Sequence, residues 1–456
     1  MPRPTLITAT LPTFGEPEVQ PAIPASTYAA RQVNTLARAA AEGLDALVVY
    51  GDREHAANVA WLTGYDPRFE ETLLVMVPGR TPHLLVGNEG WGYAELALGP
   101  FERVLCQTFS LPGQPRGNQK PLTTLLAEAG LAPGLRVGAI GWKVFTAEDL
   151  GSDASWTDLP SFIAQAIGPV VNATALLIDP ETGLRTINDA DQLATFEFAA
   201  TFASQALRNV LSAIKPGMTE LAAARLMGLN GLPLACHPML SGGPRAKFGL
   251  PSPSLDVLQK GAPVTMAVGI HGALSARAGF LAAGPEDLPP GIADYVEKLV
   301  VPYFAAVAAW YETLAIGATG GDLYAAVMAH IGDPFFGVTL NPGHTIGLDE
   351  WMHSPVYAGS TIPLVSGMAL QADVIPATGT EYFTTNIEDG VGLADARLRA
   401  EIAARYPGMW SRITARRAFM RDILGIKLAD EVLPFSNLAA ALPPFWLAPD
   451  RIMALR

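Results

Sequence analysis

The sequence predicts an α/β (α+β) chain of two domains, and three observations support this. Its 456 residues are too many for one ordinary hydrophobic core. Half of the residues are hydrophobic and only 16% are charged, which is typical of a chain that buries a large core. Short strand-like runs alternate with helical periodicities in the first part of the chain, and a long helical periodicity opens the second part.

The first domain is expected over residues 26–175, after a Pro-rich N-terminal arm at residues 1–25. Its strand-like runs are rich in Val and Leu and are bounded by Gly, Pro or Asp. The expected elements are helices at 26–43 and 122–130 and strands at 44–51, 71–79, 83–87 and 135–142. This mixture of short strands and helices predicts an α/β domain.

The second domain is expected over residues 189–400, after a junction at 176–192 that is rich in turn residues. Apolar residues recur at helical spacing from Leu193 to Ile214, which predicts a long helix. Asp189 can cap the N-terminus of this helix. Strand-like runs follow at 263–274, 368–377 and 382–394. Residues 401–456 form a C-terminal extension with an Arg-rich helix, ARRAFMRDILG, which covers the pocket or a dimer interface, or simply faces solvent.

A weak internal sequence similarity predicts two related halves in the second domain. The run AIKPGMTELAAARLM (213–227) resembles LAIGATGGDLYAAVM (314–328) when a two-residue insertion is allowed. In both runs a long helix ends at a glycine and a second helix begins after a Thr or Gly. The alternative is a chance similarity between two Ala-rich helix starts.

Charge and cysteine content limit the partners and the compartment. The net charge of −13 argues against a nucleic-acid partner, since phosphate binding needs a surplus of Lys and Arg. Cys106 and Cys236 are far apart and form no CxxC pattern, so no disulfide framework is expected. The N-terminus has no apolar signal-peptide core, and no segment is apolar enough to span a membrane. We therefore expect a cytoplasmic protein that acts on a small molecule.

Three motifs, in order, contain the residues of chemical interest. NPGHTIGLDEW (341–351) contains His344, SGMALQADVIPA (366–377) contains Asp373, and NIEDGVGLAD (386–395) contains Glu388. Both acids lie in apolar strand-like runs, where an unpaired carboxylate is costly to bury. We therefore expect them in a pocket or an ion pair rather than at casual positions.

The order of these motifs, after SGGPRA (241–246) and LQKGAPV (258–264), resembles the creatinase/prolidase/methionine-aminopeptidase superfamily of pita-bread hydrolases. The resemblance covers about residues 30–400. It implies a creatinase-like N-terminal domain, a pita-bread domain with pseudo-two-fold halves, and a homodimer. Metal-dependent members of that superfamily hold two divalent ions with two Asp on a strand pair, one His and two later acids. His344 matches the histidine, Glu388 the final acid, and Asp373 a position that usually carries Glu.

The sequence departs from this pattern at the two Asp positions. They fall at Ala267 and Ala276, and no acid occurs between Asp256 and Glu286. The resemblance thus implies a divergent member that lacks both metal-ligand aspartates, and we expect no two-metal centre and no required cofactor. The alternative is a single divalent ion, Zn, Mn or Fe, held by the three remaining ligands. A metal-free site has a precedent in the superfamily that the sequence resembles: creatinase hydrolyses a small guanidino compound without metal.

Five further residues are candidates for the site. His237 is a candidate to replace the proton-shuttling histidine that the resemblance implies near Leu250; the alternative is a structural turn histidine. Arg277 would place a cation where a metal used to be and pair with Asp373 or Glu388; the alternative is a structural arginine. The remaining candidates for substrate binding are His271, Glu350 and His353.

The leading functional hypothesis is a creatinase-like hydrolase of a C–N bond in a small polar substrate, without an essential two-metal site. His344 would transfer protons, and Asp373 and Glu388 would orient the substrate. One alternative is a metal-dependent Xaa-Pro dipeptidase or aminopeptidase with a reduced metal site. The other is a non-catalytic pseudo-peptidase that binds a ligand or partner.

Overall fold

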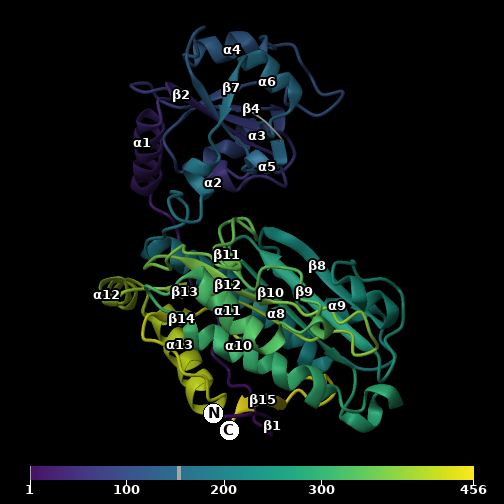
Figure 1. Cartoon of the computed structure of the whole chain (residues 1–456). Coiled ribbons are helices and arrows are strands. Elements are labelled where there is room, and N and C mark those ends of the chain that lie inside the picture. Colours follow the sequence, from purple (N-terminus) through teal and green to yellow (C-terminus); the bar gives the residue numbers. More distant parts are fainter. Residues whose placement is uncertain (1, 151–155) are drawn as a thin grey trace. The chain divides into compact units, whose positions relative to one another are not determined.

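The computed structural model describes residues 2–150 and 156–456, which form two compact units (Figure 1). One unit is Ala22–Thr186, and the other combines the N-terminal arm, up to Pro21, with Ile187–Arg456. The arm therefore belongs to the C-terminal unit. Within the described residues no helix has the length and hydrophobicity that a membrane span requires.

The N-terminal unit is built on a six-stranded sheet with the order β5-β4-β3-β2-β6-β7. Its strands are β2 (Ala46–Gly51), β3 (Thr72–Met76), β4 (His83–Val86), β5 (Glu102–Leu105), β6 (Val137–Ile140) and β7 (Val170–Asn172). Its helices are α1 (Ala25–Ala41), α2 (Ala57–Thr63), α3 (Asn88–Tyr93), α4 (Leu122–Glu128), α5 (Ala147–Leu150), α6 (Ser161–Ile167) and α7 (Ala175–Ile178). Each strand and helix predicted for this domain is present, with ends that differ by a few residues.

The C-terminal unit contains a seven-stranded antiparallel sheet with the order β11-β12-β13-β10-β9-β8, in which β14 also pairs with β13. Its strands are β8 (Leu234–Gly242), β9 (Pro263–Ile270), β10 (Ala273–Phe280), β11 (His344–Thr345), β12 (Ala369–Val374), β13 (Asn386–Leu393) and β14 (Val432–Pro434). The run predicted as one strand at 263–274 is two strands, because Gly272 adopts a φ of 101° in the tight turn between them.

Two helix pairs repeat the same geometry in this unit. They are α8 (Ala190–Ala213) with α9 (Glu220–Arg225) and α10 (Val301–Thr313) with α11 (Gly320–Ile331). Thr219 and Thr319 cap the second helix of each pair, and Gly217 and Gly317 take positive φ in the connecting turns. The two turns have equal length, so the two-residue insertion allowed from sequence was wrong. The internal sequence similarity therefore reflects two helix pairs with the same local fold.

The long helices pack on one face of the sheet. Val264, Met266 and Val268 of β9 share a buried core with α8, and Ile387 and Val391 of β13 share one with α10. Successive residues of a strand point to opposite faces of the sheet, so the residues next to these core positions point away from the helices. Ala267 and Glu388 therefore lie on the other face of the sheet.

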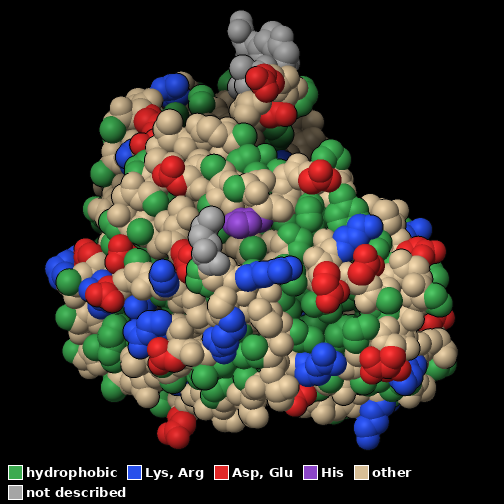
Figure 2. All heavy atoms as spheres, turned by 60° about the horizontal axis from the view of Figure 1, so that its bottom comes forward, with side chains coloured by type: hydrophobic (Ala, Val, Ile, Leu, Met, Phe, Trp, Pro, Cys, Tyr) green, Lys and Arg blue, Asp and Glu red, His purple; other side chains and the backbone are tan. Residues whose placement is uncertain are grey.

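Both chain ends close onto the same unit. β1 (Pro4–Thr8) pairs antiparallel with β15 (Arg451–Leu455), as Figure 1 shows near the N and C labels. The extension adds the helices α12 (Ala396–Arg405) and α13 (Pro407–Ala418). On the face of the molecule drawn in Figure 2, acidic and basic side chains are interspersed, and the basic ones are not gathered in a stripe.

The arginines of α13 hold this extension on α8. The carboxylate of Glu197, 1% exposed, accepts hydrogen bonds from Arg412 at 2.8 and 2.6 Å and from Arg416 at 2.7 Å. The side chain of Arg416 is fully buried, so the Arg-rich helix does not simply face solvent. Burial raises the pKa of Glu197, but Arg416 and Arg412 outweigh it and hold that pKa below its ordinary value.

A first prediction concerns the pH dependence of stability. A carboxyl with a lowered folded-state pKa stabilises the fold above its unfolded pKa, and this stabilisation is lost as pH falls through the folded pKa. At neutral pH Glu197→Gln should lower the free energy of unfolding by about 3 kcal/mol, because it breaks a buried ion pair. The difference from the native protein should shrink below about pH 4.

The measurement is urea unfolding of both proteins at neutral and acidic pH. The matched control is Glu54→Gln, which removes an exposed carboxylate paired with Arg53 and should change stability little at either pH. An equal loss from Glu197→Gln at both pH values would contradict the electrostatic explanation.

Candidate active site

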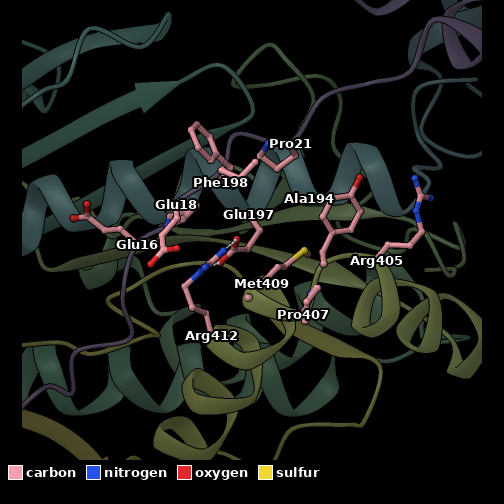
Figure 3. A pocket seen from close by; sticks show the side chains of 14 residues that line it. Glu16, Glu18, Pro21, Ala194, Glu197, Phe198, Arg405, Pro407, Met409 and Arg412 are labelled. Atoms are coloured by element: carbon pink, nitrogen blue, oxygen red, sulfur yellow. Dashed lines mark hydrogen bonds and ion pairs between the residues drawn. The ribbon is translucent and has the colours of Figure 1, made fainter.

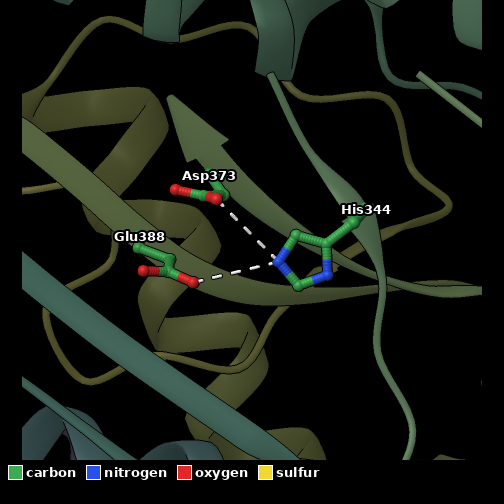
Figure 4. Close-up of side chains that lie close together, drawn as sticks. All are labelled: His344, Asp373 and Glu388. Atoms are coloured by element: carbon green, nitrogen blue, oxygen red, sulfur yellow. Dashed lines mark ion pairs between the residues drawn. The ribbon is translucent and has the colours of Figure 1, made fainter. Parts of the chain in front are cut away.

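The structure brings His344, Asp373 and Glu388 together on the face of the sheet opposite the helices (Figure 4). They come from β11, β12 and β13, and each is at most 6% exposed. Asp373 is directly opposite Glu388 in the strand register. The Nε2 of His344 lies 4.0 Å from Asp373 Oδ2 and 3.9 Å from Glu388 Oε1.

The loop after β11 folds back over His344. The Thr345 amide donates to the His353 carbonyl at 2.7 Å, which closes the loop into a narrow turn. Glu350 Oε1 then lies 3.2 Å from His344 Nε2, and the Trp351 ring stacks on the imidazole at 4.1 Å between ring centroids. Glu350 therefore joins the group as a third carboxylate beside the imidazole. No sequence argument singled out Trp351, whose role depends on the path of this loop.

A single row of positions crosses four strands at the site. Asp373 faces Glu388, Glu388 faces Ala276, and Ala276 faces Ala267. Residues directly opposite in an antiparallel sheet point to the same face, with Cβ atoms about 4.5–5.5 Å apart. The two alanines thus extend the row in which the two acids lie. Aspartates at those positions would point into the same site.

The alanine end of the row is apolar. Ala267 and Ala276 form a small buried cluster with Met239 and Leu274, and Cys236 packs against it. Alanine methyl groups offer no ligand atom and cannot neutralise a second dication. The residues present therefore do not fit a two-metal centre. One half of the row, with Asp373 and Glu388, is acidic, and the other half, with Ala276 and Ala267, is hydrophobic.

In the acidic half of the row, the pKa values of Asp373, Glu388 and His344 depend on one another. Burial raises the pKa of Asp373 to about 6, against the opposing effect of His344. Burial, with the nearby Asp373 charge, raises the pKa of Glu388 well above its ordinary value. Burial lowers the pKa of His344, but Glu350 and Glu388 outweigh it and raise that pKa to about 10. At neutral pH these directions favour an imidazolium beside a facing pair of acids that keeps one proton, on Glu388 rather than on Asp373.

The same residues fit one divalent ion. His344 Nε2 makes no hydrogen bond of acceptable geometry despite its contact with Glu350, and Asp373 Oδ1 is also buried without a hydrogen-bond partner among the described residues. With Glu388, one nitrogen and two oxygen atoms lie within 4.8 Å of one another. One imidazole and two carboxylates are an accepted ligand set for a catalytic ion with an open position.

Arg277 does not belong to this group, and the expectation that it pairs with Asp373 or Glu388 was wrong. Its guanidinium is buried on the helix side of the sheet, where Nη2 binds Asp389 Oδ2 at 2.6 Å and Nε donates to the Ala441 carbonyl at 3.0 Å. The reason is the alternation of a strand. Ala276 points to the site, so its neighbour Arg277 points away.

The three remaining histidine candidates have different surroundings. His271 lies in the β9–β10 turn, five residues or about 16 Å along the strand from Ala276. His353 pairs with Thr345 through its backbone, and its Nδ1 lies 3.3 Å from the Ser354 carbonyl. His237 is exposed on β8, with Nε2 3.1 Å from the Leu250 carbonyl, close to the place where a proton-shuttling histidine was expected. The roles expected of His237, His271 and His353 stay predictions.

Comparisons with known proteins identify similar folds. Residues 194–395 match the model of a family described as metallopeptidase family M24. A search of the curated proteins gave no significant match. The solved structures similar to this chain include a dipeptidase, a prolidase and an aminopeptidase.

Dipeptidase PepE from Mycobacterium ulcerans is 20% identical with a TM-score of 0.59, over 83% of this chain and 95% of that one. Prolidase from Thermococcus sibiricus is 18% identical with a TM-score of 0.63, over 81% and 95%. Aminopeptidase PepP from Pseudomonas aeruginosa is 14% identical with a TM-score of 0.55, over 84% and 98%. These similarities confirm the predicted fold, an N-terminal α/β domain followed by a pita-bread domain.

The row of opposed positions leads to a second prediction. The double variant Ala267→Asp/Ala276→Asp should gain affinity for Mn²⁺ or Zn²⁺ of at least about a hundredfold over the native chain, since each added carboxylate ligand is expected to contribute about tenfold. Calorimetric titration with the metal alone measures this. The control adds Glu388→Gln to the double variant, which should remove most of the gain. An unchanged affinity would show that the two alanines do not point into the ligand group.

Proposed function

We propose that this chain, whose residues 194–395 form a domain of metallopeptidase family M24, hydrolyses a C–N bond in a small, positively charged molecule without a two-metal centre. The observation that carries the proposal is the row in which Ala267 and Ala276 continue the line of Glu388 and Asp373. The similar structures are described as dipeptidase, prolidase and aminopeptidase, which supports hydrolysis as the class of reaction. A cytoplasmic homodimer, expected from the sequence, is part of the same proposal.

The charge of the site favours a cation. Three carboxyl groups, those of Glu350, Asp373 and Glu388, surround the single imidazole of His344. With the imidazole protonated and one proton kept by the two facing acids, about one negative charge remains to be balanced. An ammonium or amidinium group of the substrate supplies that charge. The hydrophobic half of the row then contacts a nonpolar part of the same molecule.

The reaction needs one proton acceptor and one proton donor. A carboxylate of the facing pair accepts a proton from a water molecule as its oxygen attacks the carbon of the C–N bond. The His344 imidazolium donates a proton to the nitrogen as the C–N bond breaks. The products are an oxygen-bearing acyl or carbamoyl group and a free amine. Trp351 stacks on the imidazole and Glu350 contacts its Nε2, so the donor is held in one orientation.

A second candidate is a Xaa-Pro dipeptidase or aminopeptidase with one divalent ion. It is favoured by the fit of His344, Asp373 and Glu388 to a single ion and by the peptidase names of the similar structures. A bound ion would polarise a carbonyl group and lower the pKa of a water molecule. In that case the three residues would act as ligands and not as proton carriers.

The third prediction separates these candidates. The purified chain should hydrolyse a member of a panel of small cationic amides and amidines, and a chelator should leave the turnover unchanged. His344→Gln should lower kcat by about 10²–10⁴-fold, the usual contribution of a proton-transferring side chain. The matched control is His330→Gln, at an exposed position on α11, which should leave kcat unchanged.

Two outcomes would overturn the leading proposal. Turnover that requires a stoichiometric divalent metal would establish the second candidate. Binding of panel compounds that His344→Gln weakens, without turnover of any of them, would instead identify a non-catalytic binding protein.

A further inference from the structure

A cavity of about 600 Å³ lies in the C-terminal unit, apart from the His344 group (Figure 3). Three segments line it: the arm from Glu16 to Pro21, the first half of α8, and residues 405–412, which run from the end of α12 into α13. α8 packs on the helix side of the sheet, whereas the His344 group lies on the other face. The volume is within the range of small-molecule binding sites, about 300–1,000 Å³.

One end of the cavity has an excess of positive charge. Glu197 is the single carboxylate between two guanidinium groups, those of Arg412 and Arg416. Arg416 uses its other donors on Asn437 and Thr201. Arg412 uses Nε and Nη2 on Glu197, and its Nη1 has no acceptor among the described residues.

The free Nη1 lies at the start of α13. A Cβ atom placed on Gly408 would lie 3.7 Å from it, and both residues line the cavity. α13 begins at Pro407, and the preceding residue, Tyr406, provides no side-chain cap. Pro407 has no N–H, and the Trp410 amide donates to the Tyr406 carbonyl at 3.0 Å. The amides of Gly408 and Met409 therefore remain available to an anion. They lie beside a guanidinium group with free N–H donors. Together these groups form an anion subsite.

The arm supplies the opposite charge. Glu16 and Glu18 line the cavity, and neither forms an ion pair with a described residue. The part of the arm that precedes Glu16 is anchored, because Arg208 of α8 donates to the carbonyls of Leu11 and Pro12, and Asn437 donates to the carbonyl of Gly15. These bonds bring Glu16 and Glu18 to the cavity.

The remaining lining is largely nonpolar and includes Ala194, Phe198, Pro407 and Met409. We propose that this cavity binds a small zwitterion of the α-amino-acid type with a hydrophobic side chain. Its carboxylate binds Arg412 Nη1 and the first turn of α13, its ammonium group binds Glu16 or Glu18, and its side chain packs on Phe198 and Met409. This binding is independent of the proposed hydrolysis, because none of the residues involved belongs to the His344 group.

Calorimetric titration of the full chain with L-leucine and L-methionine tests the proposal. Binding at millimolar or lower concentration is expected, and N-acetyl-leucine and leucinamide should each bind about tenfold more weakly, since each lacks one charge. Gly408→Asp places a carboxylate next to Arg412 and should weaken binding by more than about tenfold. Gly408 is exposed and begins a helix, where Asp is favourable, so this variant should fold.

The matched control is Gly408→Asn, which has the same shape without the charge and should bind within about threefold of the native chain. The variant Glu16→Gln/Glu18→Gln removes both carboxylates proposed to bind the ammonium group, so it should weaken the binding of leucine and leave the binding of N-acetyl-leucine unchanged. Equal binding of leucine to this variant and to the native chain would overturn the ammonium assignment. Absence of binding to the native chain, or binding that survives Gly408→Asp unchanged, would overturn the site itself.

Discussion

The buried ion pair between Arg277 and Asp389 joins β10 to β13 at the register on which the candidate site depends. Both side chains are 1% exposed, so neither charge has water to replace its partner. Loss of one partner would cost about 3–5 kcal/mol. Their chain neighbours, Ala276 and Glu388, are directly opposite each other on the other face of the sheet. A shift of the register by one residue would turn both side chains away from the site. The ion pair on the helix side of the sheet therefore stabilises the register that the candidate site on the other face requires.

In the proposed metal-free site, protons and hydrophobic contacts take the place of metal ions. Two facing acids at Asp373 and Glu388 repel each other unless a cation or a proton lies between them. His344 supplies the cation, and burial raises the pKa of both acids, which favours a proton shared by the pair. The two positions that would add further negative charge are alanines instead. The acidic half of the row can therefore exist without the dinuclear centre that the full ligand set would require.

The sequence predicted that His344, Asp373 and Glu388 form one group, because their motifs occur in a specific order, and the structure brings the three side chains together. It also located Ala267 and Ala276, since no acid is present nearby to take their place. It failed for Arg277, because the resemblance aligns positions but the alternation of the strand decides which face a side chain occupies. The cavity could not be predicted, since it forms only where the arm returns to α8 and α13, segments that are far apart in the chain.

The two sites share one structural support. The segment from Asn437 to Ala441 follows β14, and Asn437 accepts hydrogen bonds from Arg416, which is bound to Glu197 beside the cavity. Four residues later, the Ala441 carbonyl accepts a hydrogen bond from Arg277, and the Ala440 amide donates to Asp389 at 3.0 Å. Ala440 adopts a φ of 60°, a conformation that costs a non-glycine residue about 1 kcal/mol. The hydrogen bond that Ala440 makes in this conformation supports the Asp389 carboxylate, whose ion pair with Arg277 fixes the register of the candidate site.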